Sequence, residues 1–273
     1  AELIRDNYTR YDGFVVLHGT DTMSYTASAL SFLLENLAKP VVFTGSQIPI
    51  GVLRTDGREN LITAIEIAGA RCDGHPVVPE VSLYFQNRLF RANRTTKRSA
   101  EALSAFRSYN YPPLAEVGVN IAYNRQAILQ PAQYGDELRI ATRLSGGIEL
   151  IKLFPGLSVE ILEAMLAAPG LRAVVLETYG AGNAPTSKQF IQVLKEAVDR
   201  GIILLNITQC GGGCVSMGLY ETGLSLQKTG ALCGYDMTSE AAVTKLMYIL
   251  GLGLSDEESR NLLRKPLRGE FTL

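Results

Sequence analysis

The sequence has little of what metal sites, disulfide scaffolds and nucleic-acid-binding surfaces depend on. Its 273 residues include no tryptophan, two histidines and four cysteines. Neither histidine has ligand spacing to Cys210 and Cys214, so we expect no zinc site. Sparse cysteine in a chain of this length is typical of reduced thiols in a cytosol. The formal net charge is −1, which gives no attraction to nucleic acid or to an anionic membrane.

Long apolar segments are also absent. No apolar run approaches the roughly 20 residues of a membrane-spanning helix, and no stretch has the pattern of a secretory signal. We therefore expect a cytoplasmic protein with neither a membrane nor a nucleic acid as partner. With 47% hydrophobic and 19% charged residues, the composition is that of a globular protein with a sizeable core, long enough for one large domain or two modest ones.

Residues 14–50 organise the first half of the chain as strand, polar turn, helix, strand and polar turn. Apolar runs at Phe14–Leu17 and Val41–Thr44 predict strands buried on both faces. Apolar residues at helical spacing predict a helix over 22–37. Such a unit is expected to be a right-handed crossover with parallel strands. Ligands of these sheets bind beyond the carboxyl ends of the strands.

The same βα rhythm continues along the chain and restarts after residues 147–156. We predict an α/β fold of two doubly wound lobes with mainly parallel sheets, residues 1–146 and a smaller C-terminal domain of residues 147–273. Asp56 fits the N-cap of a helix over 54–70, with Glu59 placed for a capping box, and Thr238 fits the N-cap of a later helix. The other predicted elements are helices over 159–168, 186–200, 237–250 and 256–263, and strands over 81–85, 173–177 and 202–207.

The turn after the first strand, residues 18–22, has chemical content. Gly19 lets the backbone turn sharply and approach a ligand, and Thr20 offers a hydroxyl at the strand tip. Asp21 and Thr22 stand at an N-cap position, so the following helix would present its N–H groups and positive dipole end. Taken alone, these residues are better explained as helix caps, because caps far outnumber active sites.

Four motifs in order give the chain a family resemblance. HGTDTM at residues 18–23, TGSQIPI at 44–50, NRTTK at 93–97 and YGAGNAP at 179–185 resemble the bacterial-type L-asparaginases, in particular their type I, cytosolic branch. The resemblance implies an amidohydrolase without a cofactor that converts L-asparagine to L-aspartate and ammonia. It also implies a homo-oligomer, which we expect to be a homotetramer with active sites near subunit interfaces.

The resemblance also implies roles for particular residues. Lys97 is expected to touch the Thr20 hydroxyl and to act as its base, since a threonine is a poor nucleophile until a base removes its proton. Asp21 is expected to bind the α-ammonium group of the substrate. The backbone around Gly45 and Ser46 is expected to hold the leaving amide. Four basic residues in the window 86–97 are otherwise typical of a solvated surface.

Two further site residues follow from the C-terminal motifs. Asn183 matches an asparagine that reaches the active site of a neighbouring subunit in the family, although a Gly-rich βα loop is common without such a role. Tyr220 matches a tyrosine that some relatives direct into the active site. Both are interpreted as substrate-binding residues.

One departure from the family leaves alternatives open. The family carries its primary nucleophile in a TGGTI-like motif upstream of HGTDTM, and the 273 residues contain no TGGTI. Either they are part of a longer molecule, or the chain is a truncated or degenerate asparaginase that binds amino acid or assembles without turnover. A glutamine-directed amidase is a further alternative, but its transfer-RNA-dependent relatives need a basic surface that a net charge of −1 does not suggest.

Overall fold

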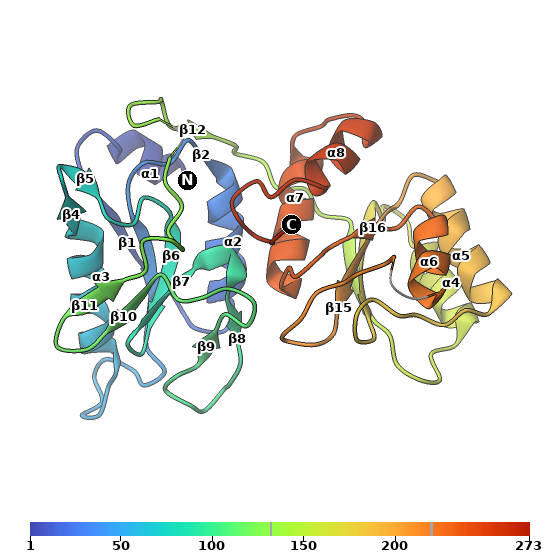
Figure 1. Ribbon diagram of the computed structural model, residues 1–273, viewed down its shortest axis with the longest axis horizontal. Helices are drawn as coiled ribbons and strands as arrows, with labels where there is room; N and C mark the ends of the chain where they lie inside the picture. Colours follow the sequence, from blue (N-terminus) through green and yellow to red (C-terminus); the bar gives the residue numbers. More distant parts are fainter. Residues whose placement is uncertain (132, 219–220) are drawn as a thin grey trace. The chain divides into compact units, whose positions relative to one another are not determined.

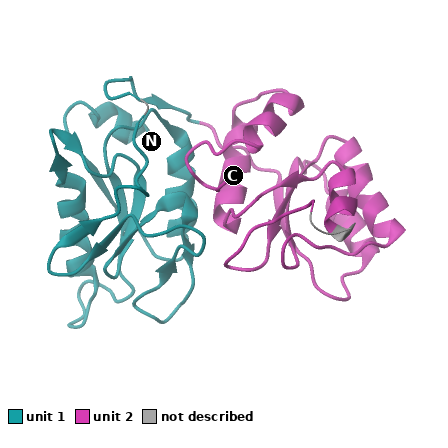
Figure 2. Ribbon diagram, viewed as in Figure 1, with its two compact units in different colours: residues 1–142 teal, residues 143–273 magenta. Residues whose placement is uncertain are grey.

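Two β-sheets, one in each half of the chain, organise the computed structural model, which describes residues 1–131, 133–218 and 221–273 (Figure 1). The chain forms two compact units, residues 1–142 and 143–273 (Figure 2). The sequence-based boundary after residue 146 lies four residues further on than residue 142. Over the described residues, no helix has both the length and the apolar character needed to cross a bilayer.

The N-terminal unit is built on a six-stranded sheet in the order β1-β3-β6-β7-β10-β11. The first three strands pair in parallel, and the other three extend the sheet in antiparallel fashion. The elements of this unit are α1 (Glu2–Asn7), β1 (Phe14–Leu17), α2 (Met23–Leu33), β2 (Leu34–Glu35), β3 (Val41–Thr44), α3 (Gly57–Gly69), β4 (Arg71–Cys72), β5 (His75–Pro76), β6 (Val81–Phe85), β7 (Arg88–Arg91), η1 (Ala92–Arg94), β8 (Thr96–Lys97), β9 (Phe106–Arg107), β10 (Ala115–Val117), β11 (Ile121–Tyr123) and β12 (Arg139–Ile140).

Helices α2 and α3 cover opposite faces of this sheet (Figure 1). Helix α2 packs on the face of Val41 and Phe43, whereas α3 packs on the face of Val42. The chain nevertheless steps in one direction, from β1 to β3 and on to β6. Two crossovers that step in the same direction but place their helices on opposite faces of the sheet have opposite hands. Of the crossovers β1–α2–β3 and β3–α3–β6, one is therefore right-handed, as predicted for β1–α2–β3, and the other is left-handed. The predicted parallel pairing of β1 with β3 is confirmed.

Two predictions for the first strand and helix need correction. Strand β1 has the predicted bounds but lies at the sheet edge, so its residues are half-buried and Leu17 is exposed, whereas β3 is buried throughout. Helix α2 ends at Leu33, four residues before the predicted end at residue 37. The chain leaves the helix there because Leu34 becomes extended and pairs with Ile140 of β12, about a hundred residues away.

The C-terminal unit has a four-stranded, fully parallel sheet in the order β13-β14-β15-β16. Helices α4, α5 and α6 pack on one face and α7 lies on the other (Figure 1). The predicted helices and strands are present with ends shifted by one or two residues, and Thr238 caps α7 as predicted, accepting a hydrogen bond from Ala241 N. The elements are β13 (Ile148–Lys152), α4 (Val159–Leu166), β14 (Ala173–Thr178), α5 (Lys188–Asp199), β15 (Ile203–Thr208), α6 (Glu221–Lys228), β16 (Leu232–Cys233), α7 (Ser239–Gly251) and α8 (Asp256–Leu263).

Candidate active site

The two polar turns that follow β1 and β3 lie against each other. The His18 N–H donates to the Thr44 carbonyl at 3.0 Å. A Cβ atom built on Gly45 would lie 2.3 Å from the His18 carbonyl oxygen, so only glycine fits there without movement of the backbone. Gly19 is in open space, with no atom within 4 Å of such a Cβ. The close approach at Gly45 therefore brings the two turns together.

Lys97 joins these turns from a distant part of the chain. It lies in β8, where it pairs with Phe106 of β9. Its Nζ atom donates to Thr20 Oγ1 at 2.8 Å and to Asp21 Oδ1 at 2.6 Å. The predicted contact between Lys97 and Thr20 is thus present, across a sequence separation of 77 residues. The Lys97 side chain is 17% exposed and that of Asp21 is 93% exposed, so the cluster is open to solvent on the aspartate side.

Helix capping does not explain the turn after β1. Thr22 is the N-cap residue of α2, but its side chain makes no capping hydrogen bond. The Asp21 carboxylate is bound to Lys97, and the structure gives its Oδ2 atom no partner among the described residues. The first turn of α2 therefore lacks a side-chain cap from Thr22, and its positive dipole end faces the turn after β1.

The Lys97 ammonium controls the titration of Asp21. Its hydrogen bond, and then its charge, lower the pKa of Asp21 below the ordinary value of 3.8. Because the pKa in the folded protein is lowered, the contact is complete above the ordinary pKa and is lost as the pH falls through the lowered one. Asp21 therefore stays an anion, able to bind a cation, throughout the neutral range.

We expect Lys97→Met to raise the pKa of Asp21 toward 3.8, because both the hydrogen bond and the charge that lower it are removed. A carbon-detected NMR titration of the aspartate carboxyl groups measures this shift directly. Arg98→Met is the matched control, since Arg98 is bound to Ser104 instead. An Asp21 titration that is the same in wild type and Lys97→Met would contradict the contact.

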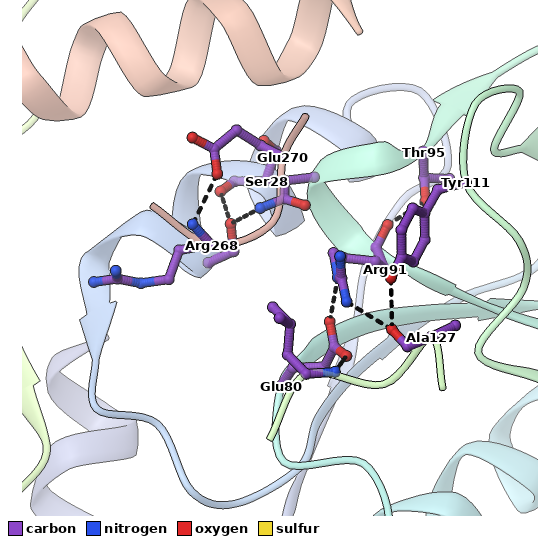
Figure 3. A network of polar contacts seen from close by, with 11 residues as sticks. Ser28, Glu80, Arg91, Thr95, Tyr111, Ala127, Arg268 and Glu270 are labelled. Carbon is purple, nitrogen blue, oxygen red and sulfur yellow. Dashed lines mark hydrogen bonds and ion pairs between the residues drawn. The ribbon is translucent and has the colours of Figure 1, made fainter. Parts of the chain in front are cut away.

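The basic segment that leads to Lys97 is mostly buried, so the expectation of a solvated surface is wrong here. Arg91 and Arg94 are only 3% and 2% exposed. Arg91 forms an ion pair with the buried Glu80 at 2.7 Å and donates to the Ala127 carbonyl at 2.8 Å (Figure 3). Both guanidinium groups lie over the Tyr111 ring. These contacts fix the chain just before β8 and hence the point from which Lys97 extends.

The second turn contains Ser46 and a residue that the sequence reading overlooked. Ser46 is half-buried and packs against Gly57, where α3 begins. Gln47 Oε1 accepts the hydrogen bond of the Thr20 hydroxyl at 2.8 Å, which places Gln47 in the cluster itself. Its only sequence signal was its place in TGSQIPI, beside Ser46. Side-chain amides are common in turns, so no feature of the sequence distinguished Gln47 from other turn residues.

Asp56 binds the backbone of the second turn instead of capping α3 as predicted. It occupies the N-cap position of α3, but its side chain makes no capping hydrogen bond, so the predicted capping box with Glu59 is absent. The Asp56 carboxylate accepts hydrogen bonds from the backbone N–H groups of Gln47 and Ile48 at 3.0–3.1 Å, and Thr55 Oγ1 accepts the Gly57 N–H. Asp56 therefore holds the second turn in place.

Of the two site residues predicted in the C-terminal unit, Asn183 and Tyr220, the structure describes Asn183. Asn183 follows the carboxyl end of β14, where its backbone N–H and carbonyl pair with those of Tyr179 in a tight loop. Tyr220 lies outside the described residues. The structure thus brings together Thr20, Asp21 and Lys97, with Ser46 in the adjoining turn.

Comparison with known families gives two matches that together cover most of the chain. The model described as "Asparaginase, N-terminal" matches residues 1–129, and "Glutaminase/Asparaginase C-terminal domain" matches residues 147–263. The chain is 48% identical over 273 residues to L-asparaginase 1 of Escherichia coli (strain K12), covering all of this chain and 78% of that protein. It is also 46% identical over 274 residues to the 60 kDa lysophospholipase of Mus musculus, of which it covers 47%.

A solved structure extends the similarity to three dimensions. The crystal structure of L-asparaginase I from Vibrio cholerae O1 biovar eltor str. N16961 superposes with a TM-score of 0.90 at 45% sequence identity. The match covers 100% of this chain and 80% of that one. Similarity at this level, over both halves of the chain, extends well beyond the four short motifs.

Proposed function

The chain belongs to the asparaginase family, and we propose that it hydrolyses the side-chain amide of L-asparagine to L-aspartate and ammonia with Thr20, Lys97 and Asp21 at its catalytic centre. The observation that carries the proposal is that Lys97 Nζ binds both Thr20 Oγ1 and Asp21 Oδ1 at the carboxyl end of β1. A lysine nitrogen within hydrogen-bond reach of both a hydroxyl and a carboxylate supplies groups that acyl transfer from an amide requires.

Substrate binding follows from the charges around the cluster. The α-ammonium of asparagine binds the exposed Oδ2 of Asp21 by a charge-assisted hydrogen bond. The amide to be cleaved lies toward the second turn, where the backbone of Gly45 and Ser46 faces the same edge of the sheet. The uncapped start of α2 favours the α-carboxylate of the substrate, because helix N-termini attract anions.

Lys97 acts as the general base. In its neutral form it takes the proton of the Thr20 hydroxyl, from which its Nζ is 2.8 Å away. Thr20 in turn takes the proton of the attacking nucleophile, which the family pattern places in a TGGTI-like motif. A C–O bond forms at the amide carbon, the C–N bond breaks, and the nitrogen takes back the proton held by Lys97, by way of Thr20, and leaves as ammonia. Water then releases aspartate. Asp21 orients Lys97 as well as the substrate, much as the aspartate orients the histidine in a Ser-His-Asp triad.

We further propose that the enzyme is a cytoplasmic homo-oligomer in which Asn183 reaches the active site of a neighbouring subunit and Tyr220 is a substrate-binding residue. The position of Asn183 in a tight loop beyond β14 supports the first role. The four cysteines, all within described parts of the chain, are unpaired, which is consistent with a reducing compartment.

The function is tested by measuring ammonia release from L-asparagine and from L-glutamine by the purified protein. We expect release from asparagine. Absence of release from asparagine, with the protein folded, would contradict the proposed function. Release from glutamine alone would reassign the enzyme as a glutamine-directed amidase.

A further inference from the structure

Gln47 lies at the centre of the cluster without being part of the reaction proposed above. Its side-chain oxygen accepts the Thr20 hydroxyl at 2.8 Å. Its side-chain nitrogen contacts the carbonyl oxygens of Ala100 at 3.3 Å and Ala102 at 3.2 Å. Ala100 and Ala102 belong to the loop between β8 and β9, which begins directly after Lys97. One amide group thus connects Thr20 to the segment that carries Lys97.

The surroundings determine which end of the Gln47 amide faces Thr20. Carbonyl oxygens only accept hydrogen bonds, so the NH2 group must face Ala100 and Ala102. The oxygen is then left facing the Thr20 hydroxyl. The reverse orientation would place an amide oxygen against two carbonyl oxygens. The direction of the hydrogen bond from Thr20 to Gln47 is therefore fixed by the backbone of the Lys97 loop.

The backbone of Gln47 is held from the other side. Its N–H group donates to both carboxylate oxygens of the buried Asp56, at 3.0 and 3.1 Å. Asn60 donates to Asp56 at 3.1 Å and to the Gly45 carbonyl at 2.9 Å. Gln47 is therefore anchored at its main chain as well as at its side chain, so its oxygen has little freedom to move away from Thr20.

We propose that Gln47 is a positioning residue, which accepts the hydrogen bond of the Thr20 hydroxyl so that a lone pair of Thr20 Oγ1 faces Lys97, and which ties Thr20 to the loop after Lys97. A hydroxyl has one proton to donate and lone pairs to accept with. The protonated Lys97 donates a hydrogen bond to a lone pair of Thr20 Oγ1, and Gln47 Oε1 accepts the hydrogen bond that the hydroxyl donates. The Thr20 side chain is thereby held in one rotamer, with its oxygen beside the lysine nitrogen.

This arrangement has a consequence for the reaction, and here the inference rests on the proposed function. Once Lys97 is neutral, the Thr20 proton turns from Gln47 to Lys97 by rotation about the C–O bond, while the heavy atoms stay in place. Without Gln47, the threonine rotamer and the loop after Lys97 are both released. The loss falls on the chemical step, because Gln47 faces the hydroxyl and the loop and has no part in the proposed substrate contacts.

Gln47→Met tests the inference, because methionine keeps the length of the side chain and removes both ends of the bridge. We expect kcat for asparagine to fall about tenfold, the rate equivalent of one lost hydrogen bond. KM is expected to change by less than about threefold, as for an interaction that acts on the chemical step. Ser99→Ala is the matched control, because Ser99 Oγ accepts from Glu101 N and Ala102 N in the same loop without touching Thr20. Its kcat should stay within about twofold of wild type.

A second measurement does not depend on turnover. In the folded wild-type protein, the NH2 protons of Gln47 should exchange slowly with solvent, because both point at carbonyl oxygens. Their NMR signals should shift in Thr20→Val, which removes the hydroxyl donor. They should stay unchanged in Thr22→Val, whose side chain makes no capping hydrogen bond.

The outcomes separate this inference from the proposed function. If the wild type releases ammonia from asparagine and Gln47→Met has the wild-type kcat, the positioning role is overturned and the function stands. An equal loss of kcat in Ser99→Ala would also overturn it, in favour of loop rigidity alone. If the wild type releases no ammonia, the proposed function is contradicted. The NMR signals of the Gln47 side-chain amide then test the positioning role by themselves. Slow exchange and a shift in Thr20→Val support the bridge, whereas exchange as fast as in free glutamine overturns it.

Discussion

Replacing Lys97 by methionine is expected to lower kcat for asparagine by a factor on the order of 10² to 10⁴, the range of a lost general base. The ammonium of Lys97 is within 2.8 Å of Thr20 Oγ1, and no other lysine or histidine is bonded to that hydroxyl in the described residues. Methionine fills a similar volume but carries no proton acceptor of useful basicity. Steady-state kinetics of ammonia release, with circular dichroism as a check of folding, measures the effect.

The neighbouring arginine provides the control for this prediction. Arg98→Met removes a positive charge one residue away, but Arg98 is bound to Ser104 and not to Thr20 or Asp21. We expect its kcat to stay within about threefold of wild type, as for a surface substitution away from the site. Near-normal turnover by Lys97→Met would refute the base role. An equal loss in both variants would point to the overall charge of the segment instead.

The largest expected loss of stability comes from a buried ion pair in the C-terminal unit. The Nζ of Lys245 in α7 lies 2.6 Å from Glu270 Oε1, and both side chains are 0% exposed. Its other ammonium protons reach the carbonyls of Leu263 and Lys265. The Glu270 carboxylate also accepts the N–H groups of Leu267 and Arg268, the latter drawn in Figure 3. All three donors of the ammonium are therefore satisfied.

Glu270→Gln is expected to lower the free energy of unfolding by about 3 to 5 kcal/mol, because it leaves a buried charge without its counter-ion. Burial already lowers the pKa of Lys245, and the Glu270 carboxylate opposes that effect. Urea unfolding monitored by circular dichroism measures the loss. Asp199→Asn is the matched control, since it breaks the exposed i,i+4 pair with Lys195, for which we expect about 0.5 kcal/mol or less.

The double variant Lys245→Met Glu270→Gln distinguishes the cause of that loss. If the unpaired charge is responsible, removing the lysine charge as well should recover part of the stability. If the double variant loses as much free energy of unfolding as the two single variants together, the loss is attributed to packing around α7 instead.

The sequence predicted the strands and the turns best, because their signals are local. Short apolar runs such as Val41–Thr44 become strands wherever helices cover both faces, and the polar residues after them then lie at one edge of the sheet. The contact between Lys97 and Thr20 was not visible in the local pattern. It came from the order of four motifs, and in the structure it joins β8 to the turn after β1 across 77 residues.

Contacts between distant residues account for what the sequence did not predict. Helix α2 stops early because Leu34 pairs with Ile140, and no signal near Leu34 announces that partner. Arg91 is buried because Glu80 is buried with it, although a basic window alone indicates a surface. Gln47 is an ordinary residue for a turn and Asp56 an ordinary residue for a helix N-cap. Only the folded backbone shows that they hold the second turn against Thr20.

A double-mutant cycle between Lys97 and Thr20 tests the central claim most directly. The kcat for asparagine is measured for Thr20→Val, Lys97→Met and the variant carrying both changes. If the two residues act as one unit, the double variant is about as slow as the slower single variant, because the second change removes nothing further. If instead the two losses multiply, Lys97 and Thr20 act independently, and the catalytic centre proposed here is contradicted.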